Sequence, residues 1–380
     1  MRIGVDASRL AVGHRTGTEN YAFQLIRGLV SLAGESQKQN LTLYFNQPPS
    51  AAVLDELKLN PAVETRSIPF PRLWTHLRLS REMLQHAPDR LFVPAHVLPL
   101  YHPSYSIVTV HDLGYLYFPA AHTAASRLYL DLSTRFSATQ ARRVIAVSQA
   151  TKNDLVRHYG IKPEKIEVIY HGYDAERYRP IEDQEERRVA RSTYGIGPGR
   201  FLLYIGTIQP RKNLLRLLEA FQALIRDPQF EDVQLVLGGK AGWLSEPILN
   251  KAAEIQASQP GRVLLPGYLD DKHLPALLSE ASAFVFPSLY EGFGMPVLEA
   301  LACGCPVVCS NSSSLPEVAG EAALYHHPLD TLALEERLRQ VLTMPELVAE
   351  LRCKGLAQAA RFSWEACALQ TWQVLTSGDK

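Results

Sequence analysis

The sequence predicts an α/β protein of about two domains, in which parallel sheets carry helices on both faces. Short apolar segments that suit buried strands alternate along the chain with longer amphipathic segments that suit helices, and this alternation is typical of parallel sheets. The chain has 380 residues, enough for about two domains, each with a core of its own. Hydrophobic residues make up 46% and charged residues 21%, the composition of an ordinary globular protein.

Charge and cysteine content narrow the class of protein further. The formal net charge is +0, so we expect no nucleic-acid partner. No run of 18 apolar residues suits a membrane span, and the apolar start is too short for a signal peptide. The five cysteines are an odd number and lie late in the chain, which favours a reducing compartment over a disulfide framework. We therefore expect a cytoplasmic protein.

In the first half of the chain, apolar runs predict strands separated by helices. A capping-box spacing between Thr16 and Glu19 predicts a helix that begins near Gly17, and Ser148 is placed to cap another helix that runs to about Tyr159. The predicted strands are Arg2–Asp6, Leu41–Phe45, Val63–Ile68, Ile107–Val110, Val144–Val147 and Val168–Tyr170.

His111 and Asp112 follow directly after the predicted strand Ile107–Val110. Ligands of open α/β sheets bind at the carboxyl ends of the strands, so we predict a catalytic role for His111 as a hydrogen-bond donor. The alternative is a structural histidine. Asp112 could either orient the imidazole or cap the loop.

A basic and aromatic segment lies between the third and fourth predicted strands. Arginines interleaved with aromatic residues can dock on anionic lipid headgroups, but such a pattern is more often a solvated helix face, which is the interpretation we favour. The residues are Arg66, Phe70, Arg72, Trp74, Arg78 and Arg81.

The second half begins after a charged connector over residues 175–200. A strand is predicted at Phe201–Ile205, followed by a turn that carries Arg211 and Lys212 and by a helix at Leu214–Leu224. Two cations at a strand-to-helix turn are placed to neutralise a diphosphate, the arginine as a bidentate fork and the lysine as a point charge. A solvated basic turn is the alternative. Further strands are predicted at Gln234–Leu237 and Val263–Leu265.

The stretch from Phe286 to Asn311 carries the strongest signal. A strand at Ala283–Phe286 precedes a glycine-rich turn, and Pro296 suits the first turn of a helix that runs to about Cys303. A helix N-terminus offers unpaired N–H groups and a partial positive charge, and glycines let an anion approach the backbone. Glu291 and Glu299 flank this turn, so two carboxylates are available to accept hydrogen bonds from hydroxyl groups.

The other features of the second half indicate structure and no further binding site. Cys303, Cys305 and Cys309 fit no zinc spacing, and we expect buried thiols and no metal. Helices are predicted at Leu332–Leu342, Glu346–Ala360 and Trp364–Leu375.

The motif Pro-Ser-x-x-Glu-Gly-Phe-Gly-x-Pro-x-x-Glu-Ala around Glu291 and Glu299 resembles the Glu-x7-Glu motif of family 4 retaining glycosyltransferases. The resemblance implies the GT-B fold, with two Rossmann-like domains whose parallel sheets face each other across a cleft. The implied domains are residues 1–174 on the acceptor side and 175–362 for the nucleotide-sugar. A last helix in 363–380 would cross back to the first domain, with Trp364 and Trp372 packing there or in the second core.

The resemblance also implies roles for individual residues. Glu299 would hold the ribose, Glu291 would grip the sugar and take part in catalysis, and His111 and Lys212 would be the other catalytic residues. Thr207 stands where many members carry arginine, so Arg211 would take over that contact. The remaining implied donor contacts are Gly17, Tyr268, Leu269, Gly292, Phe293, Gly294, Met295 and Leu298.

The expected activity is therefore that of a retaining hexosyltransferase. The motifs Val-His-Asp-Leu and Gly-Thr-x-x-Pro-Arg-Lys-Asn resemble those of bacterial mannosyltransferases that use GDP-mannose and build surface polysaccharides, with UDP-glucose as the next donor. The chain shows no Asp-x-Asp for a metal, and we expect no cofactor. The acceptor would be a glycan or a lipid-linked glycan, reached at the inner face of the membrane. The alternatives from other classes are a GT-B sugar-nucleotide epimerase and a non-catalytic sugar-nucleotide-binding subunit.

Overall fold

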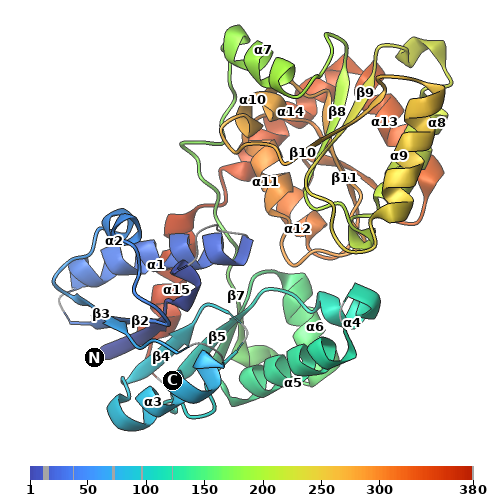
Figure 1. Ribbon diagram of the computed structural model, residues 1–380. Helices are drawn as coiled ribbons and strands as arrows, with labels where there is room; N and C mark the ends of the chain where they lie inside the picture. The colour runs from blue at the N-terminus through green and yellow to red at the C-terminus, as the bar shows by residue number, and fades with distance from the viewer. Residues whose placement is uncertain (12–16, 37, 71–72, 96, 122, 379–380) are drawn as a thin grey trace. The chain divides into compact units, whose positions relative to one another are not determined.

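The computed structural model describes residues 1–11, 17–36, 38–70, 73–95, 97–121 and 123–378 (Figure 1). The chain forms two compact units. Unit 1 consists of Met1–Gly172 together with Phe362–Lys380, and unit 2 of Tyr173–Arg361.

Unit 1 is built on a seven-stranded sheet in which every strand pairing is parallel. The strand order is β3-β2-β1-β4-β5-β6-β7, so the chain order reverses beside β1. The strands are β1 (Arg2–Asp6), β2 (Asn40–Phe45), β3 (Val63–Ser67), β4 (Arg90–Val93), β5 (Ser106–Val110), β6 (Arg143–Ala146) and β7 (Ile166–Val168).

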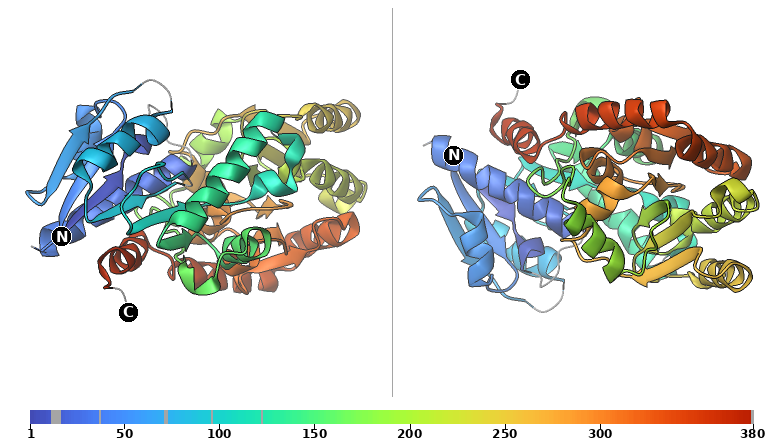
Figure 2. Two further views of the ribbon diagram at one scale, coloured as in Figure 1. Left: turned by 90° about the horizontal axis from the view of Figure 1, so that it is seen from below. Right: turned by 90° about the horizontal axis from the view of Figure 1, so that it is seen from above.

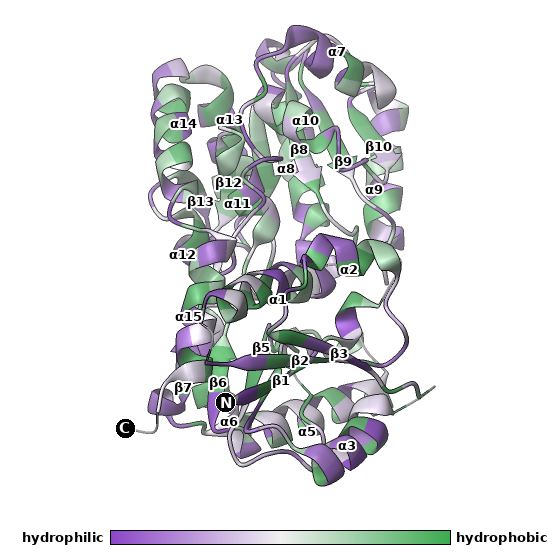
Figure 3. Ribbon diagram, turned by 90° about the vertical axis from the view of Figure 1, so that its left-hand side faces the viewer, coloured by the Kyte–Doolittle hydropathy of each residue, from purple (hydrophilic) through white to green (hydrophobic). Residues whose placement is uncertain are grey.

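Helices cover both faces of this sheet, as Figures 1 and 3 show. They are α1 (Gly17–Ser36), α2 (Ala51–Leu57), α3 (Ser80–His86), α4 (Gly114–Tyr117), α5 (Ala124–Gln140), α6 (Gln149–Tyr159) and α15 (Trp364–Thr376), with a π-helical turn η2 (Thr75–Leu79) directly before α3. Ser148 caps α6 as predicted, because its side chain accepts a hydrogen bond from the Thr151 N–H.

The strands of unit 1 match the sequence predictions with two differences. β4 was not among the predicted strands. The strand predicted at Val168–Tyr170 lies two residues earlier, at β7. After β7 the chain leaves the sheet, and His171 turns inward against Tyr21.

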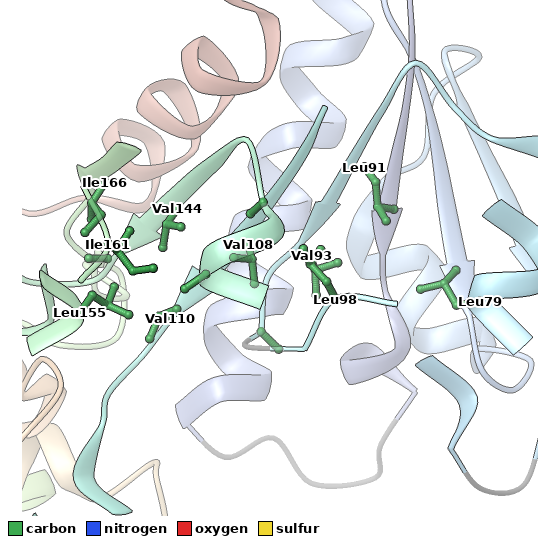
Figure 4. Packing of buried hydrophobic residues seen from close by; sticks show 14 of the residues in the cluster. Leu79, Leu91, Val93, Leu98, Val108, Val110, Val144, Leu155, Ile161 and Ile166 are labelled. Carbon is green, nitrogen blue, oxygen red and sulfur yellow. The ribbon is translucent and has the colours of Figure 1, made fainter. Parts of the chain in front are cut away.

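The core of unit 1 lies between its sheet and the helices α3, α5 and α6 (Figure 4). β5 is buried along its whole length, as expected for a central strand of a parallel sheet with both faces covered. Leucine, isoleucine and valine side chains from several elements pack together there, including Leu79, Leu91, Val108, Val144, Leu155 and Ile166.

The other face of the sheet carries α1 and α15, which lie against each other. A Cβ atom on Gly28 would come within 2.4 Å of the Ala368 Cβ, so only glycine allows this approach. The Trp364 ring lies 6.1 Å from the Tyr21 ring. Trp364 and Trp372, both buried, thus belong to unit 1.

Unit 2 contains a six-stranded parallel sheet of order β10-β9-β8-β11-β12-β13. Its strands are β8 (Phe201–Ile205), β9 (Gln234–Gly238), β10 (Val263–Gly267), β11 (Ala283–Phe286), β12 (Val307–Ser310) and β13 (Ala323–His326). Its α-helices are α7 (Gln184–Thr193), α8 (Leu214–Leu224), α9 (Glu246–Ser258), α10 (Leu274–Glu280), α11 (Met295–Ala302), α12 (Leu315–Ala319), α13 (Thr331–Thr343) and α14 (Pro345–Ala359). The predicted bounds of β8, α8 and β11 are confirmed residue for residue.

Candidate active site

The candidate site of unit 2 lies where the strand order reverses. β8 pairs in parallel with β11, and the chain continues from β8 to β9 on one side and from β11 to β12 on the other. Loops that leave such a pair diverge and form a crevice at the carboxyl edge. Here the two loops are tied together, because the Leu289 N–H donates to the Arg211 carbonyl at 2.9 Å and Asn213 Nδ2 donates to the Pro287 carbonyl at 3.0 Å.

A cluster of three charged side chains joins these loops. Lys212 Nζ lies 2.7 Å from Glu291 Oε1, and Arg211 Nη1 lies 2.9 Å from Glu291 Oε2. Arg211 Nη1 also donates to the Tyr290 carbonyl at 2.5 Å. Each carboxylate oxygen thus faces one cation. Lys212 and Glu291 are both buried, and the lysine ammonium lies 4.7 Å from the centre of the Phe286 ring, a cation–π arrangement.

The electrostatics of the cluster keep Glu291 ionised. Burial alone would raise the pKa of Glu291, but the charges and hydrogen bonds of Lys212 and Arg211 hold the pKa below its ordinary value. One carboxylate between two cations leaves the cluster with a net charge of about +1. The structure therefore presents a positive, partly dehydrated site beside the loop that enters α11.

The loop into α11 is fixed by two serines from the segment after β12. The Glu291 N–H donates to Ser313 Oγ at 2.8 Å, and Ser314 Oγ donates to the carbonyls of Glu291 at 3.0 Å and Phe293 at 2.7 Å. Gly294 has φ +106°, a conformation that side chains disfavour.

The first N–H groups of α11 point upstream of the helix. Within the described residues, no protein acceptor is recorded for the N–H of Gly294 or of Met295. These groups, together with the partial positive charge of the helix end, suit an anion. An anion site at this turn stays a prediction.

Glu299 lies further along α11 in a different environment. Burial, followed by the charge of Asp271, raises the pKa of Glu299 to about 8, although a hydrogen bond with the Tyr178 side chain and the charge of Arg177 act in the opposite direction. Arg177 also pairs with Asp271, with Nη1 and Oδ2 3.3 Å apart. Near neutral pH the Glu299 side chain is therefore mostly protonated and able to donate as well as accept a hydrogen bond.

Two of the predicted donor contacts, Tyr268 and Leu269, follow β10 directly. The Tyr268 side chain is 60% exposed, and its hydroxyl donates to Asp271 Oδ1 at 3.0 Å. Lys240 Nζ lies 5.4 Å from the centre of its ring. Leu269, by contrast, is buried against Gly238, so only its backbone is available to a ligand.

The other predicted contacts in this loop differ in exposure. Gly292 and Met295 are partly exposed beside Glu291, whereas Phe293 is buried. Leu298 lies inside unit 2 with no exposed surface, so its side chain packs in the core.

In unit 1, His111 follows β5 as predicted and is buried. Its Nε2–H donates to the Pro94 carbonyl at 3.0 Å, which places the loops after β4 and β5 together. The Tyr21 ring lies edge-on 4.7 Å away, and the His171 ring 5.9 Å away. Burial lowers the pKa of His171 well below its ordinary value, and the neighbouring His111 adds to the effect.

The structure also shows where Asp112 and Gly17, the other two residues singled out in unit 1, are placed. Asp112 Oδ1 accepts a hydrogen bond from the Gly114 N–H at 2.7 Å, which is the loop-capping role. Gly17 is the first residue of α1 and has open space around the position of a Cβ. Thr16, the predicted cap of that helix, lies outside the described residues.

Unit 1 also contains a cavity of about 460 Å³ between α1, α2 and the start of α15. Its walls include Gln24, Arg27, Asn60 and Trp364, and none of the predicted donor-binding residues lines it.

Metal-binding groups do not gather within the described residues, where no group of three or more His, Cys, Asp or Glu side chains is placed to hold a metal ion. Cys303, Cys305 and Cys309 are buried free thiols, and burial raises the pKa of Cys305 to about 12.

Sequence reasoning missed several residues that shape the site. Tyr178 comes from the connector before α7, Asp271 from the loop after β10, and Ser313 and Ser314 from the segment after β12. The signal that could have found the two serines was the run of three serines at residues 312–314, directly before α12. No local pattern pointed to Tyr178.

Comparisons with known proteins agree with this geometry. Residues 187–357 match the model of glycosyl transferases group 1, and residues 15–177 match that of Glycosyltransferase Family 4. The chain is 34% identical over 303 residues to O-antigen chain mannosyltransferase B of Escherichia coli, over 80% of this chain and 76% of that protein.

Two solved structures show the same fold at low sequence identity. A sucrose-phosphate synthase from Thermosynechococcus elongatus has a TM-score of 0.73 at 21% identity, with 98% of each chain covered. HepE of Anabaena, solved with UDP and glucose, has a TM-score of 0.73 at 18% identity, with 99% of each chain covered. This chain is therefore a glycosyltransferase with the GT-B fold, and it belongs to the group 1 and family 4 glycosyltransferases.

Proposed function

We propose that this glycosyltransferase moves a hexose from a nucleotide-diphosphate sugar to a glycan or lipid-linked acceptor during the synthesis of a surface polysaccharide. Our first choice of donor is GDP-mannose, and the reaction is proposed to retain the anomeric configuration without a metal ion. The observation that carries the proposal is the cluster of Lys212, Arg211 and Glu291 beside the N-terminus of α11.

The cluster is suited to a diphosphate because its cations are already oriented. Glu291 holds Lys212 and Arg211 in place, and the N–H groups at Gly294 and Met295 add donors from the helix end. Preorganised donors of this kind stabilise the negative charge that develops as a leaving group departs. They supply the positive charge that a metal ion provides in other enzymes, which supports the metal-independent proposal.

The chemical step proposed here is a same-face displacement. The bond between the anomeric carbon and the donor phosphate oxygen breaks, and a bond from an acceptor hydroxyl oxygen to that carbon forms on the same face. The hydroxyl proton passes to the departing diphosphate. A positively charged sugar in the transition state is favoured by the ionised Glu291, which also accepts hydrogen bonds from sugar hydroxyls.

The nucleoside is proposed to lie toward Glu299 and Tyr268. Glu299 would accept from the ribose hydroxyls, and the exposed Tyr268 ring would pack on the base. His111 is proposed as a further catalytic residue, and Gly17 as a further contact to the donor.

The choice of mannose rests on the similarity to an O-antigen mannosyltransferase. All five cysteines are free, which agrees with a reducing compartment, and we propose that the enzyme acts in the cytoplasm.

A thermal-unfolding screen of GDP- and UDP-sugars tests the donor first, because a ligand that binds only the folded state raises its stability. We expect GDP-mannose to give the largest increase in Tm, and a larger increase with UDP-glucose would replace mannose by glucose. The preferred donor is then incubated with polyprenyl-linked glycan acceptors, with and without EDTA, and the product anomer is read by NMR.

The two alternative classes give different results in the same experiment. An epimerase would convert the donor sugar when no acceptor is present. A non-catalytic subunit would bind the donor but transfer no sugar to any of the acceptors. An inverted anomer, or loss of activity in EDTA, would overturn the corresponding part of the proposal.

A further inference from the structure

One face of unit 1 exposes an unusual number of large apolar side chains. Ten of the 23 large apolar residues that are exposed in the described part of the chain fall between positions 70 and 132, and each of the ten is 40–61% exposed. One of them, Tyr117, lies on α4, and the other nine come from the segment 70–101 and from α5. They are Phe70, Leu73, Leu77, Leu84, Leu100, Tyr101, Leu128, Tyr129 and Leu132. We call these nine residues the apolar face.

The residues of the apolar face come from neighbouring elements. His76 Nε2 and the Tyr129 hydroxyl are 3.0 Å apart, which joins η2 to α5. The Tyr101 N–H donates to Ser80 Oγ at 3.4 Å, which joins the loop after β4 to the start of α3. Figure 3 draws α3 and α5 side by side, and the left view of Figure 2 looks onto both.

On α5 the exposed apolar side chains share one side. Leu128 and Leu132 are one turn apart, with Tyr129 beside them, and the buried residues Ser133, Thr134, Ser137 and Ala138 lie on the opposite side. In the segment that runs into η2 and α3, Leu73, Leu77 and Leu84 are 61%, 51% and 61% exposed.

Trp74 has the opposite orientation from the one that the sequence suggests. It is buried, and its Nε1–H donates to the Ile68 carbonyl at 2.9 Å. The sequence pattern placed Trp74 among the exposed basic and aromatic residues, whereas the structure exposes leucines in that segment. Arg72 lies outside the described residues.

The exposed charged side chains of the helical segments around the apolar face are basic. The segment 73–86 and α5 together contain four arginines and two acids: Arg78, Arg81, Arg127 and Arg135 against Glu82 and Asp131. Arg81, Arg127 and Arg135 are exposed.

Glu82 is buried, with 2% of its side chain exposed, and pairs with Arg66 at 2.7 Å and with Arg78 at 3.6 Å. Asp131 is half-buried and accepts a hydrogen bond from the Tyr159 hydroxyl at 2.7 Å. Both acids are therefore drawn inward, and the outer surface is basic.

We propose that the apolar face docks this protein on an anionic phospholipid bilayer. Leucine and tyrosine side chains at this exposure gain free energy by entering the boundary between headgroups and acyl chains, while exposed arginines are attracted to anionic headgroups. The docking is peripheral, and within the described residues no helix combines the length and the apolar character that a membrane span needs. The proposal rests on unit 1 alone and does not depend on the proposed transfer reaction.

Sedimentation with vesicles tests the proposal on the full chain without any donor or acceptor. We expect the protein to bind vesicles of 30% phosphatidylglycerol in phosphatidylcholine at 0.1 M NaCl, and to bind pure phosphatidylcholine at least tenfold more weakly. Binding falls as NaCl is raised to 0.5 M, because salt screens the attraction between arginines and headgroups. Equal binding to both vesicle types, or none to either, would overturn the proposal.

Matched variants then test which face makes the contact. Leu77→Glu and Leu128→Glu should each weaken vesicle binding about tenfold, through loss of apolar contact and repulsion by the headgroups. The control is Leu332→Glu on α13 of unit 2, an exposed leucine outside the apolar face, which should bind as wild type does. Tm values within a few degrees of wild type show that the variants remain folded. A control variant that loses as much binding as the other two would contradict the assignment.

A contact with another protein copy is the competing use of such a surface. Light scattering across a concentration series distinguishes the two. A dimer that dissociates in both Leu77→Glu and Leu128→Glu, with vesicle binding unchanged, would assign the apolar face to self-association and overturn the membrane proposal.

Discussion

The two carboxylates on either side of the α11 entrance have the same chemistry but opposite electrostatic surroundings. Glu291 lies between two cations, and its pKa is lowered although it is buried. Glu299 has no such pair, and burial together with the charge of Asp271 raises its pKa to about 8. The difference shows that position along a motif does not determine the charge of a glutamate. Glu291 is suited to hold charged groups in place, and Glu299 is suited to recognise neutral hydroxyls.

The largest effect should come from removing the cation that faces Glu291. Lys212→Met is expected to lower the rate of transfer by about 10³-fold, because a preorganised charge at the leaving diphosphate is lost. Steady-state kinetics with the preferred donor measure the effect. Lys251→Met, which removes a lysine paired with Glu254 on α9, is the control and should transfer as wild type does. A fall of less than tenfold in Lys212→Met would remove this lysine from the mechanism.

The next effect concerns Glu291 itself. Glu291→Gln should reduce transfer by about 10²-fold and change the Kd of the donor by less than tenfold, because the two cations remain. Calorimetric titration gives the Kd and single-turnover kinetics give the rate. Wild-type transfer rates in this variant would show that the carboxylate is not needed, and the comparison between the two glutamates would lose its functional meaning.

For Glu299, we predict that the affinity for the donor depends on pH. If the ribose hydroxyls donate to Glu299, binding favours its ionised form, and a pKa of about 8 predicts that affinity rises about tenfold between pH 7 and pH 9. The groups that face Glu299 are Asp271, Asp174, Arg177 and Tyr178. Glu299→Gln should abolish the pH dependence. An equal dependence in the variant would assign the titration to another group.

His111 should have a smaller effect on the rate. His111→Ala removes one hydrogen-bond donor, and we expect a loss of about fivefold, equivalent to about 1 kcal/mol. The buried ring also supports the Pro94 loop, so urea unfolding must accompany the kinetics. An unchanged rate with reduced stability would make His111 a structural residue.

The two glutamates should also contrast in how the stability of the folded protein depends on pH. The pKa of Glu299 is raised in the folded state, so the folded protein binds this proton more tightly than the unfolded chain does. The free energy of unfolding therefore falls as pH rises from the unfolded pKa toward 8, by about 1.4 kcal/mol per pH unit at most. The pKa of Glu291 is lowered, so its contribution is present above the unfolded value and is lost as pH falls through the lowered pKa.

Urea unfolding of wild type and Glu299→Gln at pH 5.5, 7 and 8.5 measures this contrast. The variant should gain stability relative to wild type as the pH rises. A difference that stays constant over this range would contradict the raised pKa of Glu299.

The sequence predicted well those features that depend on local pattern. β8 and β11 are short apolar runs bounded by residues typical of turns, and each begins and ends at the residue predicted. The pairing of Lys212 with Glu291 joins residues 79 positions apart. The resemblance to family 4 glycosyltransferases implied that both residues contact the donor, but their direct pairing was not predicted.

The features that escaped prediction depend on distant segments or on irregular helix geometry. The raised pKa of Glu299 results from burial and from the charge of Asp271, whereas the hydrogen bond with Tyr178 acts against it, and no pattern around α11 reveals these distant residues. In the segment before α3, the π-helical turn η2 has more residues per turn than an α-helix. Trp74 lies directly before this turn and is buried, whereas the sequence interpretation placed it on a solvated helix face.

The packing of α15 on α1 affects the order in which the chain can fold during synthesis. Unit 1 lacks one of its own helices until residues 364–376 have left the ribosome, whereas unit 2 is complete by residue 361. The surface of α1 around Gly28 stays uncovered during the whole interval in which unit 2 is made. Of the two units, the one that begins the chain is thus the last to finish folding, and a stop codon between residues 361 and 376 would damage the unit encoded first.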